Sequence, residues 1–274
     1  MRAGCPPATF LLVEEVRYMG ESKPLKVCNR VFNVVLAALL VGATLFAGYS
    51  LWDNQQVYAE AKNVRDDLLN LRPKEGKDHR KAFEKLRKIN PDVVAWITMD
   101  GTKIDYPIVQ GEDDEEYLNK DVYGDFALSG SIFLDTQCNP SFTDAYSLVY
   151  GHHMENHLMF GDLDLYHDKK FFKKNTTGVL MTPDNTYGLE VLAVMTVNSS
   201  DSTIFSPTSW AKDCSGVLSY AKQKAEHIHS DVAEKIGADT SQERIVALAT
   251  CSSEGTEART VLLARIVPYT GDGK

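Results

Sequence analysis

The pattern of hydrophobic and polar positions begins with one uninterrupted apolar run. Residues 31–52, VFNVVLAALLVGATLFAGYSLW, hold no charged side chain and only three strongly polar ones, Asn33, Thr44 and Ser50. A helix rises about 1.5 Å per residue, so this run is long enough to cross the ~30 Å hydrocarbon layer of a bilayer. The pattern therefore predicts a transmembrane anchor at residues 31–52.

The charges that flank this run predict its orientation. Lys23, Lys26 and Arg30 precede it and Asp53 follows it. Basic residues favour the cytoplasmic side, which makes residues 1–30 a cytoplasmic tail and places the rest of the chain outside. A cleaved signal peptide is the alternative. The run is longer than an ordinary signal-peptide core, begins late and does not end in a small-x-small cleavage site, so an uncleaved anchor is favoured.

A helical pattern follows the anchor over residues 53–90. Apolar residues recur at helical spacing among charged ones at Val57, Ala61, Val64, Leu68 and Leu71. Pro73 and Gly76 interrupt the pattern, and residues 82–89 resume it. We interpret this region as a helical stalk or a pair of N-terminal helices.

From residue 91 to residue 274 the pattern becomes that of short strands. Eight runs rich in β-branched residues are separated by Gly, Asp, Asn and Pro; they are residues 93–99, 104–109, 131–135, 146–152, 178–183, 187–198, 244–251 and 260–269. The pattern predicts a mainly β domain, a closed or nearly closed barrel of about eight strands. Two helical inserts are expected, at residues 157–174 and, as one amphipathic helix between late strands, at residues 209–232.

Composition and charge limit the function classes. Hydrophobic residues make up 43% of the chain and charged residues 24%, which is typical of a globular protein. The net charge is −9, and because residues 1–30 carry five basic and three acidic side chains, the remaining chain carries −11. An acidic exported domain argues against a nucleic-acid partner.

The chain has five cysteines, of which Cys138, Cys214 and Cys251 follow the anchor. Three thiols cannot all pair within one domain, so at least one stays free. Cys138 and Cys214 either bridge or serve as small buried residues, and the second interpretation is favoured. Cys251 differs because it ends the strand-like run ALATC and precedes the polar loop SSEGTEA, where a substrate can reach a thiol.

Arg259 begins the next strand-like run, eight residues after Cys251. Two antiparallel strands with this short connection bring the two residues side by side. A guanidinium there favours a thiolate and binds a developing oxyanion. A buried cysteine and a surface arginine would give the same spacing, so other residues have to decide between these readings.

Three histidines lie in VYGHHMENHLMFGDL at His152, His153 and His157. His153 and His157 have the spacing of two metal ligands on one helix face, but the motif H-E-x-x-H is not formed and no third ligand is evident. A solvated loop is a second alternative. The third interpretation is that His152, directly after a strand, pairs with Cys251 as acid and base.

The chain resembles a class B sortase over roughly residues 80–268. The segments that carry the likeness are FEKLRKINPDVVAWITMDGTKIDYPIVQG, YLNKDVYGDFALSGSIFLD, VYGHHMENHLMFGDL, and LATC followed by Arg259. The helix expected at residues 209–232 also resembles the class B insertion. The resemblance implies a sortase β-barrel.

The resemblance places the family's catalytic histidine on His152, its cysteine on Cys251 and its arginine on Arg259. The sequence departs from the family's T-L-x-T-C motif at Ala247, and it has Ala249 where class B members often carry Ser. The residues that the resemblance suggests for the peptide groove are Leu118, Tyr150, Ala249 and Thr250.

The activity that the resemblance implies is that of a cysteine transpeptidase at the outer face of a Gram-positive membrane. Such an enzyme cleaves a C-terminal sorting signal of an exported protein, holds the protein as a thioester and passes it to an amine of the cell wall or of a pilin. It needs no cofactor and no metal. A cysteine peptidase with water as acceptor and a non-enzymatic wall-binding module are the alternatives.

Overall fold

The computed structural model describes residues 23–75, 79–236, 240–251 and 257–271, and for Cys251 it describes the backbone only. The chain forms two compact units, residues 1–53 and 54–274. Five α-helices occur in the described residues; they are α1 (Lys23–Leu69), α2 (Arg80–Ile89), α3 (Lys169–Lys174), α4 (Ser215–Lys224) and α5 (Ser230–Lys235).

Within the first unit, α1 is apolar and exposed. Its most apolar 18-residue window has a mean hydropathy of 2.2 and buries none of its residues, and the helix is long and apolar enough to cross a membrane. Leu39 and Phe46 are among its exposed side chains. The hydroxyl of Thr44 donates to the carbonyl oxygen of Leu40 at 2.8 Å, which satisfies this polar group within the helix. The composition of residues 31–52 thus suits an apolar surrounding.

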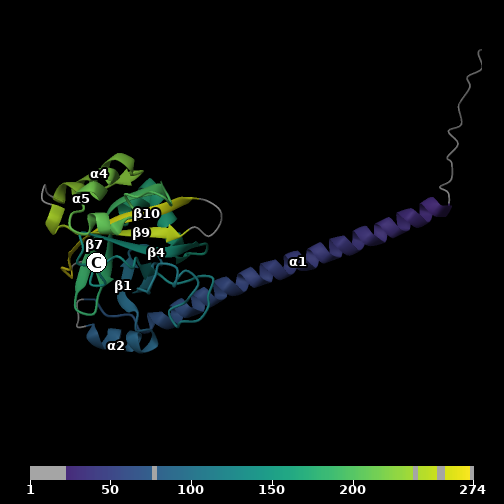
Figure 1. Ribbon diagram of the computed structural model, residues 1–274, viewed down its shortest axis with the longest axis horizontal. Helices are drawn as coiled ribbons and strands as arrows, with labels where there is room; N and C mark the ends of the chain where they lie inside the picture. The colour runs from purple at the N-terminus through teal and green to yellow at the C-terminus, as the bar shows by residue number, and fades with distance from the viewer. Residues whose placement is uncertain (1–22, 76–78, 237–239, 252–256, 272–274) are drawn as a thin grey trace, which may run out of the picture. The chain divides into compact units, whose positions relative to one another are not determined.

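The second unit is built on a closed barrel of eight strands (Figure 1). They are β1 (Val93–Met99), β2 (Asp105–Val109), β3 (Phe133–Leu134), β4 (Tyr146–Met154), β6 (Thr177–Met181), β7 (Thr186–Asn198), β9 (Ile245–Cys251) and β10 (Ala258–Pro268). The strand order is β10-β9-β4-β3-β2-β1-β6-β7, and a long antiparallel pairing of β7 with β10 closes it. The predicted mainly β fold and its eight strands are confirmed, although only two residues of the run at 131–135 join the sheet.

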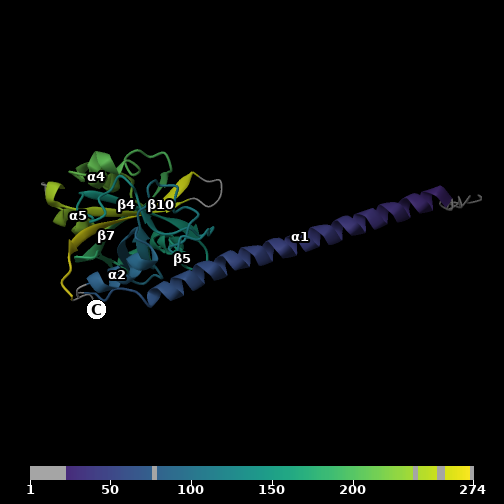
Figure 2. The same ribbon diagram turned by 60° about the horizontal axis from the view of Figure 1, so that its bottom comes forward.

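Helices cover the outer faces of the barrel, so several strands are buried on both faces. All seven residues of β1 are buried. Ile97 of β1 belongs to the large core cluster, whereas Trp96 packs in a second cluster with Phe83 and Leu86 of α2. Helices α4 and α5 lie on the side of the barrel opposite α2 (Figure 2). This double burial explains why the strand runs read as nearly continuous apolar segments rather than alternating ones.

The end of α1 belongs to the barrel unit. Ala61 and Leu68 are 5% and 2% exposed, and Val57 and Val64 pack against the two core clusters. The apolar residues that recur at helical spacing after the anchor therefore form a helix face that packs on the barrel. The predicted stalk is thus in part a packed helix.

The insert at residues 209–232 is not one helix, and this prediction was wrong. A 3-10 turn (Pro207–Trp210), α4, the two-residue strand β8 (His227–Ile228) and α5 replace it. The backbone N–H groups of Glu226 and His229 donate to Val194 and Leu192 of β7, at 2.9 and 2.8 Å. The free edge of β7 offers these hydrogen bonds, which end α4 at Ala225. The six apolar positions that suggested a single helix nevertheless all pack on the core; they are Trp210, Cys214, Val217, Ala221, Ala225 and Ile228.

The insert at residues 157–174 is also composite. It contains the short strand β5 (Leu158–Met159), a 3-10 helix (Gly161–His167) and α3. Asp168 caps α3, because its side chain accepts hydrogen bonds from the backbone N–H groups of Lys170 and Phe171 at 3.0 and 2.8 Å. The cap fixes where the helix begins, so only the last third of the expected helical insert is α-helical.

Cys138 and Cys214 are both unpaired and buried. Burial raises the pKa of Cys138 to about 12 and that of Cys214 to about 11. Both therefore stay protonated at neutral pH and are poor nucleophiles. The interpretation as small buried residues is confirmed over the disulfide.

Candidate active site

Strands β4 and β9 are parallel neighbours, and their pairing aligns His152 with Cys251. The ladder runs in register from Tyr146 and Ile245 to this last pair. Aligned residues of neighbouring strands lie about 4.8 Å apart and belong to the same face of the sheet. Two residues that are far apart in the sequence thus become neighbours at one end of the barrel.

Arg259 of β10 extends the aligned pair of His152 and Cys251 to a row of three residues, because β10 lies on the other side of β9. β10 runs antiparallel to β9, with Val261 aligned to Ala249. The same register, continued by two residues along each strand, aligns Arg259 with Cys251. The N–H of Thr260 donates to the hydroxyl of Thr250 at 3.0 Å, which holds the two strands together beyond their last ladder pair. The sequence-predicted trio therefore comes from three adjacent strands.

His152 is half-buried, and its Nδ1 atom is buried. Among the described residues this atom has no hydrogen-bond partner. Burial lowers the pKa of His152 below its usual value of 6.5, because the imidazolium is desolvated. A buried polar atom without a partner costs about 1–3 kcal/mol, and such exceptions often mark functional groups. The environment keeps the ring mostly neutral at pH 7 and makes its protonated form a stronger acid.

The neighbouring histidines bind carboxylates instead. His153 Nε2 lies 2.8 Å from Asp164, and His157 Nδ1 lies 2.5 Å from Asp162. Each ring is thus held by its own aspartate. In the described part of the chain, no group of three His, Cys, Asp or Glu side chains is arranged to hold a metal ion.

A groove opens beside the row. Eight residues line it: Asp114, Leu118, Phe133, Tyr150, Ser199, Phe205, Thr250 and Arg259. Leu118, Tyr150 and Thr250 are three of the four residues suggested for a peptide groove. The fourth, Ala249, is fully buried beside Tyr150 in the β4–β9 ladder, and it does not line the groove. The alanine at this position therefore acts in the core of the barrel.

The wall of the groove is aromatic. The Tyr150 ring lies parallel to the Phe205 ring, with centroids 6.3 Å apart, and tilted against Phe133 at 5.2 Å. The Tyr150 hydroxyl donates to the buried Asp135 carboxylate at 3.1 Å, which fixes the ring. Burial raises the pKa of Asp135. A fixed aromatic wall offers a large apolar contact area to a bound side chain at low entropic cost.

The sequence analysis missed Asp114, Phe133, Ser199 and Phe205 as lining residues. Asp114 and Arg259 are the two charged members of the lining, and they have opposite signs. Asp114 accepts a hydrogen bond from the N–H of Thr136 at 2.8 Å. Three of the four missed residues lie in loops or at a strand end, where no periodic pattern marks them. Phe133 is the exception, because it lies within a predicted strand run.

The groups assembled here suit covalent acyl transfer. A cysteine supplies a nucleophile, an imidazole moves a proton, and a guanidinium binds negative charge on a carbonyl oxygen. The Nη1 group of Arg259 donates to the carbonyl oxygen of Ala258 at 3.1 Å, which ties the side chain to its own strand. A peptide lying in the groove would pass Arg259 and Thr250 at the end of the β9–β10 pair.

Comparisons with known proteins agree with this chemistry. The sortase domain family matches residues 97–267. Sortase B of Staphylococcus aureus is 31% identical over 248 residues, which cover 86% of this chain and 97% of the relative. Sortase B of Listeria monocytogenes is 29% identical over 227 residues, 80% of this chain and 89% of the relative.

Solved structures give the same result. A crystal structure of a Streptococcus pyogenes class B sortase involved in pilus biogenesis has a TM-score of 0.60 and 38% identity, and the match covers 67% of this chain and 97% of that one. The Staphylococcus aureus sortase B–substrate complex has a TM-score of 0.67 and 27% identity, over 79% of this chain and 99% of that one. The chain therefore belongs to the sortase family, as a cysteine transpeptidase of class B.

Proposed function

We propose that the chain is a membrane-anchored transpeptidase that cleaves a C-terminal sorting signal of exported proteins, with Cys251 as nucleophile, His152 as acid and base, and Arg259 as the group that binds the oxyanion. The observation that carries this proposal is the row formed by three adjacent strands, with His152 paired to Cys251 and Arg259 lining the groove.

In the first half-reaction the neutral His152 takes the proton of the Cys251 thiol, and the resulting thiolate attacks the scissile carbonyl carbon to form a C–S bond. The carbonyl oxygen becomes an oxyanion, which the guanidinium of Arg259 stabilises. When the tetrahedral intermediate collapses, the C–N bond breaks and the His152 imidazolium gives its proton to the leaving amine. A thioester remains on Cys251. The low pKa of His152 favours this proton transfer.

In the second half-reaction an amine attacks the thioester. The now neutral His152 takes the proton of the attacking amine, a new C–N bond forms, and the C–S bond breaks to release the thiolate. The thiolate then regains a proton from the His152 imidazolium, so the site returns to its starting state and no cofactor is consumed.

The residues that line the groove support the proposal that the substrate is an extended peptide. Its aromatic wall of Phe133, Tyr150 and Phe205 offers apolar contact, and Leu118 extends that surface. The class B resemblance favours signals of the Asn-Pro-x-Thr type. The acceptor amine would come from a peptidoglycan precursor or from a pilin.

The test is a product analysis with an Asn-Pro-x-Thr-containing peptide, with and without a triglycine amine. We expect a peptide–triglycine adduct, and in its absence a thioester on Cys251 that mass spectrometry detects. Cys138 and Cys214 provide an internal control, because their buried thiols should carry no adduct. Hydrolysis alone, at all amine concentrations, would show a peptidase. A Cys251 thiol that reacts no faster than free cysteine would support a binding module.

We further propose that residues 31–52 anchor the protein in the membrane, with residues 1–30 in the cytoplasm and the barrel outside. The support is the exposed apolar surface of α1 and the basic residues Lys23, Lys26 and Arg30 before it. An anchor of this kind would hold the groove near the site where exported proteins emerge.

Removal of residues 1–52 should give a soluble, folded and active domain. The truncation keeps Ala61 and Leu68, whose burial helps to hold the end of α1 on the barrel. The measurements are partition between membrane and soluble fractions, thermal unfolding and peptide turnover. A matched truncation of residues 1–69 removes those contacts and should lower the Tm. An unfolded 53–274 domain, beside folded full-length protein in detergent, would show that the anchor segment belongs to the core.

A further inference from the structure

The segment that follows His152 is a strained hairpin. β4 ends at Met154, the chain turns, and β5 pairs back with His153 aligned to Met159. Asn156, His157 and Met159 have positive φ values of 60°, 64° and 50°. Residues other than glycine adopt this region at a cost and keep it only where the surroundings hold them there. A neighbouring element must therefore fix this hairpin.

The hairpin also fixes the backbone of His152. The N–H of Phe160 donates to the carbonyl oxygen of His152 at 2.9 Å. Next to it, Gly151 packs so closely that a Cβ there would come within 2.8 Å of the Phe160 ring and 2.4 Å of Ile132. The position of β5 and the position of the His152 backbone are thus set together.

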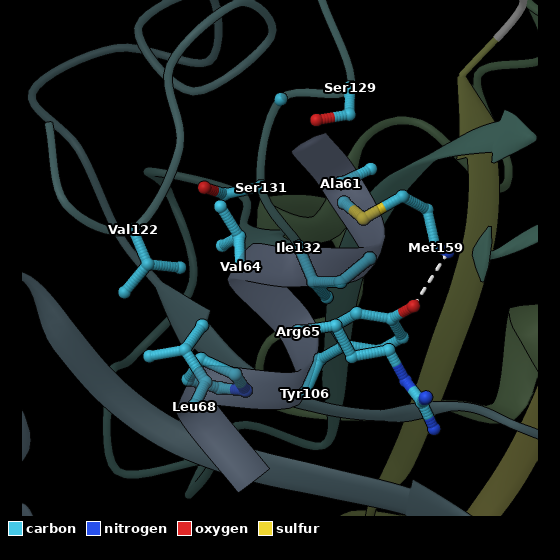
Figure 3. Close-up of a pocket in the computed structure, with 12 residues that line it drawn as sticks. Ala61, Val64, Arg65, Leu68, Tyr106, Val122, Ser129, Ser131, Ile132 and Met159 are labelled. Atoms are coloured by element: carbon cyan, nitrogen blue, oxygen red, sulfur yellow. Dashed lines mark hydrogen bonds between the residues drawn. The ribbon is translucent and has the colours of Figure 1, made fainter. Parts of the chain in front are cut away.

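Tyr106 of β2 contacts the hairpin at β5, apart from the contacts that His153 and His157 make with two aspartates. Its side chain is buried, and its hydroxyl oxygen accepts a hydrogen bond from the N–H of Met159 at 2.9 Å (Figure 3). Met159 is the residue of β5 with the positive φ. Burial raises the pKa of Tyr106 to about 12, so its hydroxyl stays neutral across the working pH range.

The Tyr106 ring is held in its turn by α1. The guanidinium of Arg65 lies 5.6 Å from the ring centroid, and its Nη2 donates to the carbonyl oxygen of Lys103 at 3.0 Å. A small cavity lies beside this contact, lined by Ala61, Leu68 and Met159 among others (Figure 3). The Tyr106 ring is therefore fixed, and the hydrogen bond that its hydroxyl makes within the described residues reaches the hairpin.

We propose that Tyr106 is a positioning residue for His152. Its hydrogen bond to Met159 holds β5 against β4, and β5 in turn holds the His152 backbone in the row with Cys251. The inference rests on the proposed function, in which His152 moves the protons. Tyr106 does not line the groove, so its role is in the proton-transfer steps rather than in peptide binding.

The experiment is Tyr106→Phe in the full-length protein in detergent, with the peptide and triglycine assay. The variant keeps the ring and leaves the Met159 N–H buried without a partner. A small displacement of a reacting group costs up to about 10²-fold in rate, so we expect kcat to fall by about 10- to 100-fold with KM within about twofold. The pKa read from the acid limb of the kcat/KM pH profile should also shift, because a displaced His152 ring is buried to a different extent.

The matched control is Tyr166→Phe. Tyr166 is also fully buried, but its hydroxyl has no hydrogen-bond partner among the described residues. Its removal should change kcat by less than about twofold. Turnover of Tyr106→Phe within twofold of wild type would overturn the proposal. Equal losses in both variants, or a raised KM at unchanged kcat, would overturn it as well.

A second measurement on the wild-type protein covers the case in which Tyr106→Phe does not fold. The Met159 amide should exchange with solvent as slowly as amides of β4, because Tyr106 holds it. Exchange at the rate of an exposed turn would overturn the proposal. A wild-type protein that forms no adduct on Cys251 would instead contradict the proposed function, so the two failures are distinguishable.

Discussion

We expect His152→Ala to lose nearly all turnover, by about 10²–10⁴-fold in kcat, because the substitution removes the group that moves protons in both half-reactions of the proposed mechanism. The leaving amine then departs without a proton, and the attacking amine has no base. KM should change much less, since His152 does not line the groove. The assay is steady-state turnover of one peptide with triglycine. The acid limb of the wild-type profile should lie below pH 6.5, because burial lowers the pKa of His152.

His153→Ala and His157→Ala are the matched controls. These rings lie on the same hairpin, but His153 contacts Asp164 and His157 contacts Asp162. The buried Nδ1 atom of His152, in contrast, has no hydrogen-bond partner among the described residues. Each should keep most of the wild-type kcat, and a zinc chelator should have no effect. Losses as large as that of His152→Ala, or inactivation by the chelator, would support a metal site at His153 and His157 instead.

The barrel strands could be predicted from the sequence because their signals are local. β-branched runs such as residues 93–99 end at Gly, Asp, Asn or Pro, and each run became a strand. The prediction of a single helix after Ser206 was wrong for a physical reason. Helical spacing reports which residues face the core, and that face is correct for Cys214 and Ala221. It does not report the free edge of β7, whose carbonyl groups bind the chain and end α4.

The residues of the candidate site could be predicted from the sequence to different degrees. Arg259 follows Cys251 in a short hairpin, so sequence proximity brings them together. The alignment of His152 with Cys251 needs a parallel pairing of β4 and β9, and no local pattern specifies such a pairing. The resemblance to class B sortases supplied that link. Phe205 and Asp114 remained hidden because loops bring them to the groove, and Ala249 is fully buried and is not among the residues that line the groove.

Arg259→Ala should lower kcat by about 10²–10³-fold, which is the usual cost of removing one donor from an oxyanion site. Arg259→Lys should recover little of this loss. A guanidinium presents a planar fork of N–H donors, whereas an ammonium is a point charge that cannot reach two acceptors in the same geometry. Arg259 lines the groove at the end of the β9–β10 pair, so its fork can contact a bound carbonyl directly.

The lysine variant separates two roles for the positive charge. If Arg259 mainly lowers the pKa of the Cys251 thiol, Lys keeps the charge and should recover much of the rate. If it binds the oxyanion, Lys should stay close to Ala. The measurements are kcat for the three proteins on one peptide and the pH dependence of Cys251 alkylation, with the buried Cys138 and Cys214 as unreactive references. We expect alkylation of Arg259→Lys to follow the wild-type pH curve while its turnover does not. Near-wild-type turnover in Arg259→Lys would contradict the geometric role, and near-wild-type turnover in Arg259→Ala would remove the residue from the site.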